Sequence, residues 1–130
     1  MNKDAKALWL TALRSGEYEQ SSGALKGVSE DGKVGYCCLG VLTDIAIKTG
    51  AVDGDWIYRE ATDSHAYRLR GGRAEGTLLP WDVAEWAGVR ANGDPREDFG
   101  SEPCTNLDLP ALNDGGLPFE VIANIIEKNL

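Results

Sequence analysis

Residues 38–49 constrain this fold more than any other segment, because they are apolar around most of a helical circumference. Only Asp44 and Lys48 give the segment a charged edge, and Gly50 follows it as a typical C-terminal stop. A helix that is apolar on nearly every side has to be covered on nearly every side. We therefore expect it to be the central buried helix. The positions that recur at three- and four-residue steps are Leu39, Leu42, Ile45 and Ala46.

Three further segments have helical patterns. Residues 4–15, 81–87 and 117–129 each place apolar side chains on one face. A proline suits the first turn of a helix and a glycine commonly follows its last turn. The residues that mark these ends are Gly16, Pro80, Gly88 and Pro118.

Two β-hairpins are predicted from short segments that flank turn signals. Residues 24–29 and 33–37 enclose an Asp-Gly pair, which is typical of a tight hairpin turn. Residues 65–70 alternate in polarity, and a Gly-Gly pair can return the chain as residues 73–79.

The remaining segments are interpreted as connections. Residues 51–62 form a connector, and residues 89–109 form a long acidic loop rich in glycine and proline. There is no internal repeat and no convincing linker, so we expect residues 1–130 to form a single domain. The predicted fold is an α+β class domain with about four helices packed on two short β-hairpins.

Charge excludes one class of partner. The 130 residues have a net charge of −8, all of which falls in residues 51–130. An acidic half repels nucleic-acid phosphates, so we expect no duplex nucleic acid as a partner. The chain has no apolar run that could span a bilayer and no signal-peptide core near its N-terminus. The expectation is a soluble intracellular protein with no membrane partner.

The cysteines allow two interpretations. The chain has three cysteines, Cys37, Cys38 and Cys104, and an odd number favours reduced thiols. Cys38 at a helix start, together with His65, could imitate a cysteine hydrolase. Burial in a core is the interpretation we favour. With a single histidine and no paired cysteine motif, a zinc site is not expected, and we assign no catalytic residue, metal or cofactor.

Three arginines form a local positive region in this acidic protein. Arg68, Arg70 and Arg73 flank the Gly-Gly turn, and no acid lies between Asp63 and Glu75. Guanidinium groups bind phosphate or carboxylate through paired hydrogen bonds. The alternative is a solvated strand edge on which arginine blocks edge pairing.

A second candidate site lies at the end of the first predicted helix. Arg14, Ser15, Tyr18 and Gln20 bring together a cation, a hydroxyl, an aromatic ring and an amide, which could stack and hydrogen-bond a planar polar ligand. The alternative is a helix C-cap, since arginine near a helix C-terminus interacts favourably with its dipole. The Asn-Asp-Gly-Gly sequence at residues 113–116 is interpreted as a cap or a turn.

Four segments together resemble a known group of proteins. Residues 9–20 (WLTALRSGEYEQ), 36–44 (YCCLGVLTD), 112–116 (LNDGG) and 119–127 are similar to a family of short, largely uncharacterised proteins of bacteriophages and prophages. The resemblance implies a phage accessory protein that works in the cytoplasm of the host bacterium. By analogy with other small phage proteins, it also implies a role against host immunity.

The function expected from these features is counter-defence. In this hypothesis the protein binds and sequesters a small nucleotide-like immune signal without turnover, as a homo-oligomer, through Arg14, Ser15, Tyr18 and Gln20 together with Arg68, Arg70 and Arg73. Two alternatives stay open. One is an enzyme that cleaves such a signal, and the other is an inhibitor whose acidic loop at residues 94–108 docks on a host protein.

Overall fold

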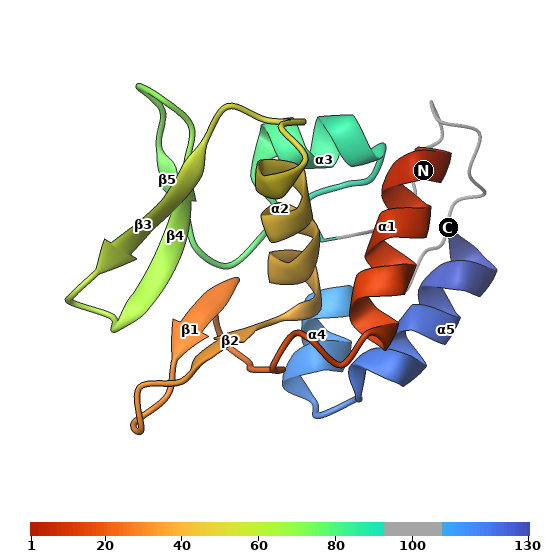
Figure 1. Ribbon diagram of the computed structural model, residues 1–130, viewed down its shortest axis with the longest axis horizontal. Helices are drawn as coiled ribbons and strands as arrows, with labels where there is room; N and C mark the ends of the chain where they lie inside the picture. Colours follow the sequence, from red (N-terminus) through yellow and green to blue (C-terminus); the bar gives the residue numbers. More distant parts are fainter. Residues whose placement is uncertain (93–107) are drawn as a thin grey trace.

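The computed structural model describes residues 1–92 and 108–130, and in them five helices lie to one side of one five-stranded antiparallel sheet (Figure 1). In chain order the elements are α1 (Lys3–Arg14), β1 (Lys26–Val28), β2 (Val34–Tyr36), α2 (Cys38–Lys48), β3 (Asp55–Arg59), β4 (Ser64–Arg68), β5 (Ala74–Glu75), α3 (Trp81–Ala87), α4 (Leu109–Asp114) and α5 (Phe119–Asn129). The α+β class predicted from the sequence is confirmed.

The strands form one sheet in the order β2-β1-β4-β3, with β5 paired to the far end of β4. Both predicted hairpin pairings, β1 with β2 and β4 with β5, are present. They are not separate units, because β1 also pairs with β4 through the registers Lys26↔His65 and Gly27↔Ser64. The connector expected at residues 51–62 is a wrong prediction, since β3 runs through it and pairs along the whole of β4.

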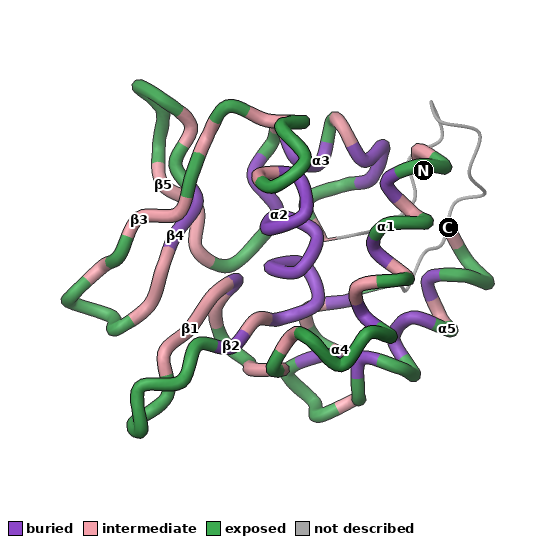
Figure 2. Tube along the Cα trace, viewed as in Figure 1, coloured by how far each residue is buried: buried purple, intermediate pink, exposed green. Residues whose placement is uncertain are grey.

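Helix α2 is the centre of the core, as its sequence predicts. Residues from Cys38 to Ala46 are all buried, and Figure 2 shows the helix as the longest buried stretch of the chain. It lies between the sheet and the α1–α5 pair (Figure 1). Gly40 permits its close approach to the neighbouring chain, because a β-carbon at this position would lie 1.7 Å from the Leu25 carbonyl oxygen. The indole Nε1 of Trp9 on α1 donates to the Cys38 carbonyl at 2.9 Å, fixing α1 against the start of α2.

The number of helices differs from the four predicted, because α4 was not expected. Its six residues are too few for a periodic apolar pattern, and the sequence there suggests a loop followed by a turn. The Asp108 side chain caps it by accepting from the Ala111 amide at 3.2 Å. Most of the predicted acidic loop at residues 94–108 lies outside the described residues. Among the helices that are described, none is both long and apolar enough to cross a membrane.

Candidate functional site

Arg14 and Ser15 both make hydrogen bonds within the chain. The Arg14 guanidinium on α1 donates to Glu127 at 2.7 Å and to the Asn124 carboxamide oxygen at 2.9 Å, both on α5. This arginine holds the pKa of the Glu127 carboxyl below its usual range. The Ser15 hydroxyl donates to the Ala12 carbonyl at 2.7 Å and accepts from the Glu17 amide. The Ser15 contacts support the helix-cap alternative, whereas Arg14 joins α1 to α5.

Tyr18 is anchored to a buried carboxylate. Its hydroxyl donates to Asp44 at 2.6 Å, and Asp44 also accepts from Trp56 Nε1 at 3.0 Å and forms an ion pair with Lys48 at 2.9 Å. Burial would raise the pKa of Asp44, but hydrogen bonds from Tyr18, Lys48 and Trp56 hold it below its usual value. Burial, with Asp44 beside it, raises the pKa of Tyr18 to about 12. The hydroxyl of Tyr18 is therefore a structural donor.

Gln20 is also used internally. Its amide nitrogen donates to the Asn113 side chain at 3.0 Å and to the Leu117 carbonyl at 2.7 Å, while its oxygen accepts from the Phe119 amide at 3.1 Å. Asn113 is 2 % exposed, accepts from the Cys38 amide at 3.2 Å and donates to the Ser21 carbonyl at 2.8 Å. The two side chains join α2, α4 and α5. The sequence suggested only a cap or turn at Asn113 and gave no sign of this role.

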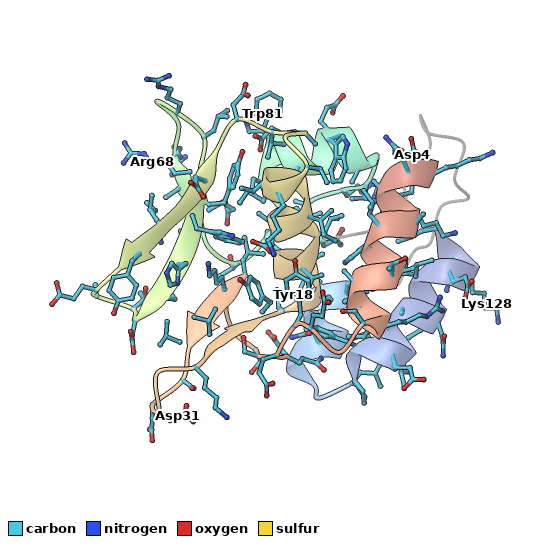
Figure 3. The ribbon with its side chains drawn as sticks, viewed as in Figure 1. Asp4, Tyr18, Asp31, Arg68, Trp81 and Lys128 are labelled. Carbon is cyan, nitrogen blue, oxygen red and sulfur yellow. The ribbon has the colours of Figure 1, made fainter. Side chains whose placement is uncertain are left out.

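The three arginines of the β4–β5 hairpin are exposed. Arg68 is the last residue of β4, and Arg70 and Arg73 lie in the connection to β5. Figure 3 shows Arg68 beside the sheet and Tyr18 near α1 and α2, in separate regions of the molecule. Within one chain, therefore, the two predicted groups do not converge on a common cavity.

One of these arginines does line a hollow. It has a volume of about 500 Å³ and lies between the β4–β5 hairpin and the start of α3. We call it the Trp81 hollow, because the Trp81 side chain lines it and is 71 % exposed. It is also lined by Tyr67, Arg73, Glu75 and Asp82.

The floor of the Trp81 hollow is held in place by hydrogen bonds. The Tyr67 hydroxyl on β4 donates to Asp82 at 2.5 Å and accepts from the Gly54 amide at 3.0 Å. Burial, together with the neighbouring Asp82, raises the pKa of Tyr67. Gly54 is required for this contact, since a β-carbon there would lie 2.2 Å from the tyrosine ring. The hydrogen bonds thus fix the Asp82 carboxylate at the rim of the hollow, while the Trp81 indole stays open to solvent.

Two other hollows contain sequence-predicted residues. One of about 500 Å³ between α1 and α2 is lined by Ser15 and Tyr18, with Leu8 and Lys48. Another of about 530 Å³ beside the β1–β2 hairpin is lined by Gln20. In both, the predicted residue already bonds within the chain. Of the three, the Trp81 hollow has the most exposed aromatic side chain, and the sequence signal for it was a large aromatic residue directly after Pro80.

The structure supports the interpretation that Cys37 and Cys38 are buried core residues rather than nucleophiles. Cys37 and Cys38 are free and buried. Burial raises the pKa of the Cys37 thiol to about 11, and burial together with Cys37 raises the pKa of Cys38 further. A nucleophilic cysteine needs a thiolate, which a raised pKa disfavours. Within residues 1–92 and 108–130, no group of three or more histidine, cysteine or acidic side chains is arranged to hold a metal ion.

Comparisons with known proteins give the family but not the activity. No curated protein and no solved structure matches the chain. One family matches residues 1–130. The protein accordingly belongs to the family described as a domain of unknown function, DUF8296.

Proposed function

We propose that this protein binds and sequesters, without turnover, a small nucleotide-derived signalling molecule, and that the Trp81 hollow is its binding site. The observation that carries the proposal is the exposed Trp81 indole lining the same hollow as Arg73. A volume of about 500 Å³ falls in the range of small-molecule sites.

Each part of a nucleotide has a complementary group at this site. A base can stack on the indole of Trp81, a contact worth about 1–3 kcal/mol per base. The carboxylates of Glu75 and Asp82 can accept hydrogen bonds from ribose hydroxyls, Asp82 through the lone pairs that the Tyr67 hydroxyl and the Val83 amide leave free. Arg73 supplies a fork for phosphate, and Arg68 and Arg70 lie on the same exposed hairpin. The stacking role expected of Tyr18 passes to Trp81 in this proposal.

The proposed biological setting follows from the phage-protein resemblance. The protein would act in the cytoplasm of a host bacterium, where it would remove a nucleotide signal used by the host's defence. A homo-oligomer would close the open side of the hollow and slow ligand release.

The test is ligand capture. Purified protein is incubated with cyclic dinucleotides and cyclic ADP-ribose derivatives, washed and heated, and the released molecules are identified by chromatography. We expect one ligand class to be released unaltered. An altered ligand would instead indicate the cleaving enzyme. No captured ligand, combined with salt-sensitive capture of a host protein, would indicate the acidic inhibitor.

Variants locate the site by isothermal titration calorimetry. We expect Trp81→Ala and Arg73→Ala each to weaken binding by about tenfold or more. Two control variants change residues elsewhere. Leu8→Ala shortens a side chain that lines the α1–α2 hollow, and Lys128→Ala removes an exposed cation on α5 (Figure 3). Loss of binding in Leu8→Ala with full binding in Trp81→Ala would move the site to the α1–α2 hollow.

A further inference from the structure

The outer edge of β3 is open for pairing. This strand pairs with β4 on one side, and within the described part of the chain no strand pairs with its other side. The Trp56 amide donates to the Asp55 side chain at 2.7 Å, so it faces away from β4. Because outward and inward amides alternate along an antiparallel strand, the Tyr58 amide faces the same open edge.

The sequence of β3 is complementary to itself. It reads Asp-Trp-Ile-Tyr-Arg, with an acid at one end, a base at the other and Ile57 in the middle. In an antiparallel pair centred on Ile57, Asp55 lies opposite Arg59 of a second copy, and this occurs twice by symmetry. Trp56 then lies opposite Tyr58 of that copy. Within these five residues, no other antiparallel register places both charges opposite their complements.

We propose that β3 is a homodimer interface, at which the strand pairs antiparallel with β3 of a second copy of this chain. The pairing joins two sheets into one and replaces the bond between the Trp56 amide and Asp55 by a bond to a strand carbonyl. The freed Asp55 carboxylate then meets Arg59 of the second copy. Opposite charges and aromatic pairs placed directly across a sheet are both stabilising.

The register requires one side-chain rearrangement: Arg59 Nη1 lies 3.8 Å from the place of a β-carbon on Gly76, so the guanidinium now extends across β4 and has to turn to the open edge when the strands pair. Tyr58 is 55 % exposed, which leaves its ring available to the Trp56 of a second copy. Asp55 is the register partner of Arg68 on β4, so in the dimer it lies between two arginines, one from each copy. Since five paired residues bury less surface than a stable interface requires, we expect a reversible, concentration-dependent dimer.

The register can be tested by exchanging the charges of Asp55 and Arg59. Analytical ultracentrifugation, with no ligand present, measures the dissociation constant of the dimer. We expect wild-type protein to dimerise with rising concentration. Asp55→Arg or Arg59→Asp alone should weaken dimerisation by about tenfold or more, because each places like charges opposite one another. The double variant restores both pairs and should return the dissociation constant to within about threefold of the wild-type value.

Circular dichroism of each variant checks that the fold is kept, and Lys33→Asp serves as a charge control on the exposed β1–β2 hairpin. A wild-type protein that stays monomeric up to about 1 mM would overturn the proposal. So would a dimer that both single variants leave unchanged, or one that the double variant fails to restore. Because no ligand is used, these results do not depend on whether the Trp81 hollow binds nucleotides.

Discussion

The hydroxyl of Tyr18 donates a 2.6 Å hydrogen bond to the carboxylate of Asp44, which is only 5 % exposed on the buried helix α2. Trp56 from β3 donates to the same carboxylate. The segment after α1, the central helix and the sheet are therefore joined at one charged group. This explains why Tyr18, which the sequence suggested as a stacking residue, is fixed within the fold.

Tyr18→Phe should lower the free energy of unfolding by about 1.5 kcal/mol, because it removes one donor from a buried charged acceptor. Urea unfolding at pH 7 measures the change. Tyr58→Phe is the matched control: its hydroxyl also donates to a carboxylate, Asp63, at 2.6 Å, but the pair is exposed, so its loss should lower the stability much less. Equal effects of the two variants would contradict the structural role of Asp44.

Gln20→Ala should destabilise the protein by about 2–4 kcal/mol, since it leaves the Phe119 amide and the Leu117 carbonyl without their side-chain partner. Glu19→Ala, at the neighbouring exposed position, should change stability by less than about 0.5 kcal/mol. Thermal unfolding of both variants gives the comparison. A Gln20→Ala protein as stable as Glu19→Ala would return Gln20 to the list of candidate ligand contacts.

Periodicity revealed four of the five described helices and local turn chemistry revealed two strand pairings, because both signals lie within a few consecutive residues. Helix α2 shows this best, since its apolar circumference alone predicts its burial. The sequence did not reveal β3. Its residues Asp-Trp-Ile-Tyr-Arg do not alternate between polar and apolar side chains, and its pairing depends on another strand, β4.

The candidate site was harder to predict than the fold. Arg14 and Gln20 were correctly seen as polar groups with directed hydrogen-bonding capacity, but their partners Glu127 and Asn113 lie about a hundred residues away in the chain. Only the folded structure shows that this capacity is already used. For Trp81 the error was the reverse. Its apolar side chain was assigned to the packed face of a helix, but in the structure it is exposed.

Gly40→Ala should prevent folding or destabilise the protein by at least about 3 kcal/mol, because the new methyl group would meet a backbone carbonyl that cannot rotate away. The contact would be with Leu25, at 1.7 Å. Gly27→Ala is the control, since its β-carbon would meet only the Ser21 hydroxyl, at 3.7 Å. Soluble expression and urea unfolding compare the two. A stable, cooperatively folded Gly40→Ala protein would show that α2 does not pack so closely.

Stability should fall with rising pH above about 8.5, where the thiol of Cys37 ionises in the unfolded chain but stays protonated in the fold. Its pKa in the folded protein is about 11, raised by burial. The neutral thiol therefore contributes in full below pH about 8.5, and the contribution, on the order of 3 kcal/mol, is lost as the pH rises towards 11.

Comparing the wild type with Cys37→Ala isolates this contribution from other alkaline titrations, because those are common to both proteins. Urea unfolding under reducing conditions at pH 7, 8, 9 and 10 gives the two slopes, and the slope for Cys37→Ala should be shallower. The absolute stability of the variant will also differ, since Cys37 Sγ accepts from the Gly40 amide at 3.4 Å and begins α2. That offset is the same at each pH below 8.5, so only the slope reports the thiol. Parallel curves would mean that the Cys37 thiol ionises as readily in the folded protein as in the unfolded chain, which would contradict its burial.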